Sequence, residues 1–73
     1  MDALYQKVAT EIAERIDSGV YIAGERLPGV RSLAHTRGVS VATAVAAYQM
    51  LADSGRVEAR PRSGFYVRPR RVI

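Results

Sequence analysis

The sequence lacks cysteine altogether and has one histidine and one lysine, although eleven of its residues are lysine or arginine. Without cysteine, neither disulfides nor cysteine-ligated zinc can stabilise the chain. Apolar residues occur in short periodic runs, none of which approaches the ~18 consecutive apolar residues of a membrane span. The first residues, Met-Asp-Ala-Leu, show no basic region followed by an apolar block, so we expect no signal peptide and a cytoplasmic protein.

Residues that could form a catalytic centre are equally scarce. His35 has no cysteine to complete a metal site and no partners for a catalytic triad. Glu11, Glu14 and Asp17 have the spacing of ordinary charges on a helix surface, and no glycine-rich phosphate loop precedes a lysine. We therefore expect no enzyme activity, no metal site and no cofactor within this chain.

The charge is distributed unevenly along the 73 residues, which suffice for one small domain. Residues 1–55 carry five basic and six acidic residues, whereas residues 56–73 carry six arginines and only Glu58. A basic C-terminal part on a near-neutral body indicates an anionic polymer as partner, although a surface that only aids solubility would look the same. The preference for arginine over lysine favours bidentate contacts with phosphates or bases.

The first predicted helix spans about residues 3–18. Leu4, Val8, Ile12 and Ile16 recur every four residues and form one apolar stripe, with the charged residues on the other side. We expect this helix to serve packing and to contact no ligand.

Two further helices are predicted on either side of a glycine. The second begins after Pro28, with Gly29 as its N-cap, and ends at Gly38; the third spans about residues 41–53. Ser40 suits the N-cap of the third helix. Two helices that meet at a glycine, the second capped by a hydroxyl, are typical of a helix-turn-helix. We expect Tyr48 to be a core aromatic residue of the third helix and not a base-stacking group.

Two short strands are predicted after the helices, at residues 56–60 and 65–68, joined by a turn at residues 61–64. Arg26-Leu27 is predicted to form a very short strand beside them. The predicted fold is mainly α with a small β-hairpin, a winged helix-turn-helix of three helices plus a wing. The domain is expected to cover residues 1–68, with residues 69–73 as the start of a basic linker to a further C-terminal domain.

Candidate DNA contacts come from three places. Arg31 lies in the first turn of the second helix, where it can reach a phosphate or base. A hydroxyl or methyl group at the start of the third helix can contact base edges, including a thymine methyl. Arginines beside the strand turn suit phosphates or the minor groove. The candidate residues are Arg31, Ser40, Val41, Thr43, Arg60, Arg62, Ser63 and Gly64.

Two functions are compatible with this pattern. The first is a DNA-binding domain of a transcription regulator with double-stranded DNA as its partner. The alternative is a winged-helix protein–protein interaction module that does not bind DNA, since fold alone does not fix function. The arginine-rich hairpin favours the first, because the second predicts an exposed apolar patch in place of a basic surface.

Four segments in combination resemble the N-terminal winged-helix domain of GntR-family bacterial transcription regulators. They are Gly-Glu-Arg-Leu-Pro at 24–28, Val-Arg-Ser-Leu-Ala at 30–34, Gly-Val-Ser at 38–40 and Ser-Gly-Phe-Tyr-Val at 63–67. Ala47-Tyr48 together with residues 59–67 is most similar to the MocR subgroup. That resemblance implies a linker leading to a large domain similar to fold-type-I aminotransferases, which binds pyridoxal phosphate and lies outside this chain.

The resemblance also implies roles for individual residues. Arg31 matches the family's DNA-contacting arginine, Ser40 and Thr43 match hydroxyl residues of the recognition helix, and residues 62–64 match the wing tip. The sequence departs from the family at Val41, where many members have arginine, and at Gly29, where many have serine or alanine. Readout is therefore expected to depend more on Arg31, Thr43 and the wing. Dimerisation is expected to lie in the part outside this chain.

Overall fold

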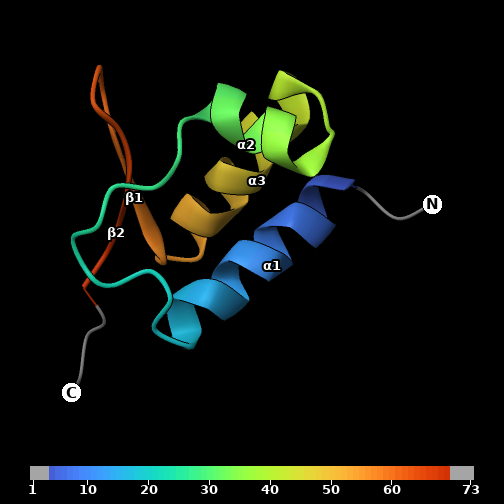
Figure 1. The fold of residues 1–73 in the computed structure, drawn as a ribbon. Coiled ribbons are helices and arrows are strands. Elements are labelled where there is room, and N and C mark those ends of the chain that lie inside the picture. The colour runs from blue at the N-terminus through green and yellow to red at the C-terminus, as the bar shows by residue number, and fades with distance from the viewer. Residues whose placement is uncertain (1–3, 70–73) are drawn as a thin grey trace.

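The computed structural model describes residues 4–69, which form three helices followed by a two-stranded hairpin (Figure 1). This confirms the predicted fold class. The elements in chain order are α1 (Leu4–Asp17), α2 (Val30–Arg37), α3 (Val41–Asp53), β1 (Val57–Arg60) and β2 (Gly64–Val67). Only Pro69 of the predicted linker start at 69–73 belongs to the described residues.

Helix α1 packs beside α3 through the predicted apolar stripe. Val8, Ala9 and Ile12 are buried in the core, and Ile16 is half-buried. The prediction is wrong for Leu4, which is 58% exposed, because the first turn of α1 lies at the edge of the helical body (Figure 1). The remainder of the stripe is confirmed as a packing surface.

The connection between α2 and α3 follows the predicted glycine turn. Gly38 ends α2 in the left-handed conformation, with φ 66° and ψ 35°, and its backbone N–H donates to carbonyls of the last turn. The Ser40 hydroxyl then accepts a hydrogen bond from the backbone N–H of Thr43 at 3.1 Å, which makes it the N-cap of α3. Gly29, the N-cap of α2, makes no side-chain cap bond because it has no side chain.

Tyr48 lies at the centre of the core, as expected for a core aromatic residue. It has no exposed surface, and its ring centroid is 4.6 Å from that of Phe65 on β2. Burial raises the pKa of the Tyr48 phenol; nearby Tyr21 raises it further, whereas Arg37 lowers it. The core therefore joins α3 to the hairpin as well as to the other helices.

The hairpin is extended by a third segment from the loop between α1 and α2. Strand β1 pairs antiparallel with β2, with Val57 opposite Val67 and Arg60 opposite Gly64. Residue Arg26 forms an isolated antiparallel bridge with Tyr66, and the backbone N–H of Leu27 donates to the carbonyl of Phe65 at 2.8 Å. The predicted edge pairing with the hairpin is thus confirmed, but as an isolated bridge at Arg26 and not as a strand over Arg26-Leu27.

The strand boundaries differ slightly from the predicted ones. Strand β1 begins at Val57 and not at 56, and β2 spans Gly64–Val67 and not 65–68. Gly64 joins the strand because glycine tolerates its φ of +119° while pairing with Arg60. The turn is consequently reduced to residues 61–63.

Candidate nucleic-acid interface

The first turn of α3 presents small side chains to solvent. Val41 is 45% exposed and Thr43 is half-buried, whereas Ala44 is fully buried. The hydroxyls of Ser40 and Thr43 lie 2.9 Å apart, within hydrogen-bonding distance. The capping bond therefore fixes Ser40 and Thr43 relative to each other and leaves the Val41 side chain outside this pair.

Arg31 is the second residue of α2 and its side chain is exposed. Within residues 4–69 it forms no salt bridge with an acidic side chain. The exposed His35 follows one turn later on the same helix, and no group of three or more possible metal ligands exists in the described part of the chain. The first turn of α2 thus offers an uncompensated guanidinium group.

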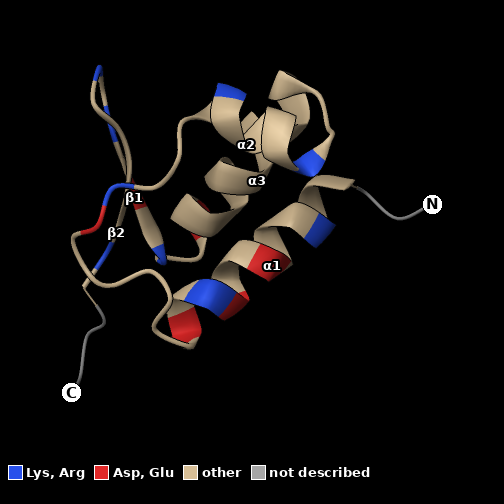
Figure 2. Ribbon diagram, in the orientation of Figure 1, with Lys and Arg blue, Asp and Glu red and all other residues tan. Residues whose placement is uncertain are grey.

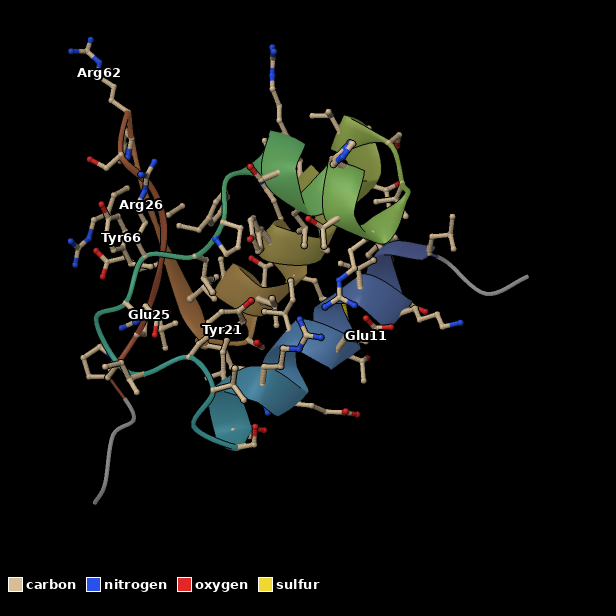
Figure 3. All side chains as sticks on the ribbon, viewed as in Figure 1. Glu11, Tyr21, Glu25, Arg26, Arg62 and Tyr66 are labelled. Atoms are coloured by element: carbon tan, nitrogen blue, oxygen red, sulfur yellow. The ribbon has the colours of Figure 1, made fainter. Side chains whose placement is uncertain are left out.

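The hairpin turn places Arg62 at the far end of the wing. Arg62 adopts φ +67° and is the one non-glycine residue with positive φ in the described chain. The backbone N–H of Ser63 donates to the carbonyl of Arg60 at 3.1 Å and closes the turn. Figure 3 shows the Arg62 side chain extending away from the body of the molecule. This guanidinium can reach a partner before any other part of the wing.

Arg60 is arranged differently from Arg62. Its Nε lies 3.3 Å from a carboxylate oxygen of Glu58, and its guanidinium carbon lies 4.3 Å from the centre of the Tyr66 ring. The sequence prediction placed Arg60 and Arg62 together as arginines that bracket the turn. The structure brings Arg60 against the outer face of the hairpin, so only Arg62 projects from the tip.

Comparison with known proteins yields one family. The sequence model of "Bacterial regulatory proteins, gntR family" matches residues 4–67, which include the helix-turn-helix and the hairpin described above. The chain belongs to the GntR family. It is a winged helix-turn-helix domain of the GntR type, and residues 4–67 are the DNA-binding domain of a GntR-type transcriptional regulator.

Relatives of this GntR domain are longer proteins. It is 48% identical over 68 residues to the uncharacterised HTH-type transcriptional regulator YjiR of Escherichia coli (strain K12), covering 93% of this chain and 14% of YjiR. The GntR-family transcription factor YtrA of Sulfolobus acidocaldarius has a TM-score of 0.85 and 33% identity, with 92% of this chain and 70% of that chain covered. The chain thus spans about one seventh of YjiR.

A second solved structure has almost the same extent as this GntR domain. It is the N-terminal domain of AraR in complex with mutant ORR3, with a TM-score of 0.87 and 27% identity. The match covers 92% of this chain and 96% of that chain. A domain of these dimensions is therefore known as a separate chain with the same fold.

Acidic side chains are concentrated away from the candidate interface of the GntR domain. Within residues 4–69, none occurs in α2, in the first turn of α3 or in the hairpin turn. Figure 2 shows basic segments at the hairpin turn and in α2, whereas acidic segments lie on α1 and beside the lower part of the hairpin. The field at this end of the molecule is consequently positive.

Two arginines of the GntR domain form ion pairs between its elements, so less of their charge is available to a partner. Arg37 forms an ion pair with Glu11 that links α2 to α1, and its side chain is only 17% exposed. Arg56 pairs with Asp17 at 3.2 Å between its guanidinium and the carboxylate. The excess of arginines counted in the C-terminal part therefore overstates the charge available to a partner, because Arg56 and Arg60 already contact carboxylates.

Sequence reasoning missed one residue that contacts the hairpin turn, Arg26. Its Nε donates to the Ser63 carbonyl at 3.0 Å, although the two residues are 37 positions apart. The available signal was the alternation expected of extended chain: an apolar Leu27 directed to the core places the side chain of its neighbour Arg26 on the opposite face.

Proposed function

We propose that this GntR domain binds duplex DNA with the first turn of α3 in the major groove and the hairpin turn against an adjacent phosphate or the minor groove. One observation carries the proposal: α2, the start of α3 and the hairpin turn all reach the same end of the molecule, and that end has exposed arginines without acidic side chains (Figures 1 and 2). A helix end with small side chains fits into a groove, and the positive charge beside it attracts the flanking phosphates.

The arginines supply the affinity in this proposal. Arg31 contacts a phosphate or a base from α2, and Arg62 contacts the backbone or minor groove from the wing. Both guanidinium groups are free of salt bridges to residues of the described chain, so neither has to leave a carboxylate on binding. Arg60 has to exchange Glu58 for a phosphate, and its contribution is therefore smaller than that of Arg62.

The start of α3 and the turn backbone supply the shape. Val41 makes apolar contact with a thymine methyl, and Thr43 presents its hydroxyl to a base edge or phosphate. Ser40 contributes mainly by holding Thr43, because its oxygen already accepts the capping hydrogen bond. Ser63 and Gly64 let the turn backbone approach the DNA closely. Specificity from this helix is thus modest and depends on methyl and hydroxyl contacts.

The experiment is a fluorescence-anisotropy titration of the domain with a duplex selected from a library with a randomised core, repeated over a range of salt concentrations. The proposal predicts that the logarithm of the affinity falls linearly with the logarithm of salt, by about 0.9 for each phosphate neutralised. Absence of binding to both selected and random duplex at low salt would favour the protein-interaction alternative.

We further propose that the domain belongs to the MocR-like subgroup and acts in the cytoplasm. The support is the Ala47-Tyr48 and 59–67 sequence pattern, together with the length of YjiR, of which this chain covers only 14%. Among the described residues, no helix has the length and apolar character needed to cross a membrane.

In this proposal a separate pyridoxal-phosphate domain mediates dimerisation, and the dimer reads two half-sites about 34 Å apart. Sedimentation of the domain alone tests the dimerisation proposal, which predicts a monomer or weak dimer.

A further inference from the structure

We infer that Arg26 is a positioning residue: it holds the hairpin turn in the conformation from which Arg62 reaches DNA. The inference rests on the proposed wing contact. Arg26 lies outside the helix-turn-helix and outside the hairpin. In this inference it increases DNA affinity through Arg62 and does not contact the DNA itself.

The base of the Arg26 side chain is fixed by backbone pairing. Arg26 forms the bridge with Tyr66, and the adjacent Leu27 is buried and donates its N–H to Phe65 at 2.8 Å. The carbonyl of Glu25 accepts the N–H of Val67 at 2.9 Å. Arg26 therefore starts from a segment that is tied to β2 on both of its sides.

The head of the side chain is fixed on the turn. Arg26 Nε donates to the Ser63 carbonyl at 3.0 Å. The guanidinium also lies against Gly64: a Cβ at that position would be 3.5 Å from Nε and 3.6 Å from Nη2. Figure 3 shows Arg26 beside the hairpin, between Tyr66 and Arg62. One side chain thus spans from the bridge with Tyr66 to the two residues that follow Arg62.

The turn requires such support because Arg62 is in a left-handed conformation. For a residue with a Cβ this conformation costs free energy, and surrounding contacts must compensate for that cost. Within the turn itself, the Ser63 N–H to Arg60 carbonyl bond is the backbone hydrogen bond that closes it. The Arg26 bond holds the opposite, carbonyl side of Ser63. Without it, we expect the turn to sample other conformations and Arg62 to lose its fixed direction.

The competing role for Arg26 is a direct phosphate contact, because its charge is not paired with a carboxylate in the described chain. The two roles differ in three measurable ways. Positioning changes the turn in the free protein, couples energetically to Arg62 and leaves the salt dependence of binding nearly unchanged. A phosphate contact acts independently of Arg62 and lowers the salt dependence by about 0.9.

The first arm of the experiment uses the free domain. The {1H}-15N heteronuclear NOEs of the Arg62, Ser63 and Gly64 amides are compared in wild type, Arg26→Gln and the control Arg15→Gln, which removes an exposed charge from α1. We expect lower NOEs at these three amides in Arg26→Gln alone, with helical amides unchanged. Unchanged NOEs in Arg26→Gln would overturn the positioning role, and this result does not depend on DNA binding.

The second arm is a double-mutant cycle for binding to the selected duplex. We expect Arg26→Gln to weaken binding roughly three- to tenfold when Arg62 is present, because the turn must then be ordered on binding. In the Arg62→Ala background the same change should cost less than about twofold. Additive losses with a reduced salt slope would overturn the inference. If Arg62→Ala alone does not affect binding, the proposed wing contact fails and the NOE comparison decides the role of Arg26.

Discussion

The hydroxyl of Tyr48 donates a hydrogen bond to the carbonyl of Pro28 over 2.5 Å. Tyr48 lies in the middle of α3, whereas Pro28 directly precedes the N-cap of α2. The bond therefore ties the helix that is proposed to enter the groove to the chain segment that starts α2 and carries Arg31. It satisfies a polar group that would otherwise be buried without a partner.

Replacement of Tyr48 by phenylalanine should lower the free energy of unfolding by about 1–2 kcal/mol, since the ring remains but the Pro28 carbonyl loses its donor. Tyr5→Phe is the matched control: no hydrogen bond from its hydroxyl occurs in the described chain, and its effect should stay within about 0.5 kcal/mol. Urea unfolding followed by circular dichroism measures both. Equal effects of the two changes would show that the hydroxyl of Tyr48 contributes nothing.

The same residue predicts a loss of stability at alkaline pH. Burial raises the pKa of Tyr48 above that of an unfolded tyrosine, near 10, so the folded state favours the neutral phenol. This contribution is complete below the unfolded pKa and declines as the pH rises above about 10, where the unfolded chain ionises first. The stability difference between wild type and Tyr48→Phe should therefore shrink between about pH 9 and 11. A difference that is constant over this range would contradict the assignment.

Two arginines on α2 should behave in opposite ways. Arg37→Gln breaks the ion pair with Glu11 and should lower stability by about 0.5–1 kcal/mol, with little effect on DNA affinity. Arg31→Gln removes an exposed group that forms no salt bridge within residues 4–69, so it should leave stability within about 0.5 kcal/mol. It should weaken DNA binding by about 1–3 kcal/mol if Arg31 reads a base. Thermal unfolding and fluorescence anisotropy on the same samples distinguish the two residues. Weaker DNA binding in Arg37→Gln together with normal binding in Arg31→Gln would contradict the assigned roles.

Substitutions of Ser40 separate helix capping from DNA contact. Ser40→Ala should destabilise the domain by about 1 kcal/mol because the N–H of Thr43 loses its acceptor. Ser40→Asp keeps an acceptor at the cap and should retain stability, but its negative charge faces the proposed phosphates and should weaken DNA binding. Normal DNA affinity in Ser40→Asp would mean that the start of α3 does not approach DNA.

Local sequence signals predicted the parts of this fold that depend on neighbouring residues. Gly38 and Ser40 mark the helix ends because a left-handed glycine and a capping hydroxyl act within one turn of the chain. The short extended segment at Arg26-Leu27 was also predictable, since Pro28 restricts the backbone before it. Together with the strands predicted at residues 56–60 and 65–68, these features predicted the winged helix-turn-helix.

Side-chain partners that lie far apart in the sequence could not be predicted. Arg26 meets Ser63 only because the segment around Arg26 pairs with β2 through an isolated bridge, and the sequence gives no measure of that pairing. Likewise, counting arginines could not show that Arg56 is paired with Asp17 across 39 positions. The candidate residues could be chosen from the sequence, and their contacts with DNA stay a prediction. Which guanidinium groups pair with carboxylates within residues 4–69 became visible only in the structure.

The salt dependence of binding in Arg62→Gln tests the central claim most directly. Arg15→Gln on α1 serves as a control that loses the same charge outside the proposed DNA interface. If the wing contacts the DNA backbone, the slope of log affinity against log salt should become shallower by about 0.9 in Arg62→Gln and stay close to the wild-type value in the control. An Arg62→Gln slope equal to that of wild type would contradict the proposed mode of DNA binding.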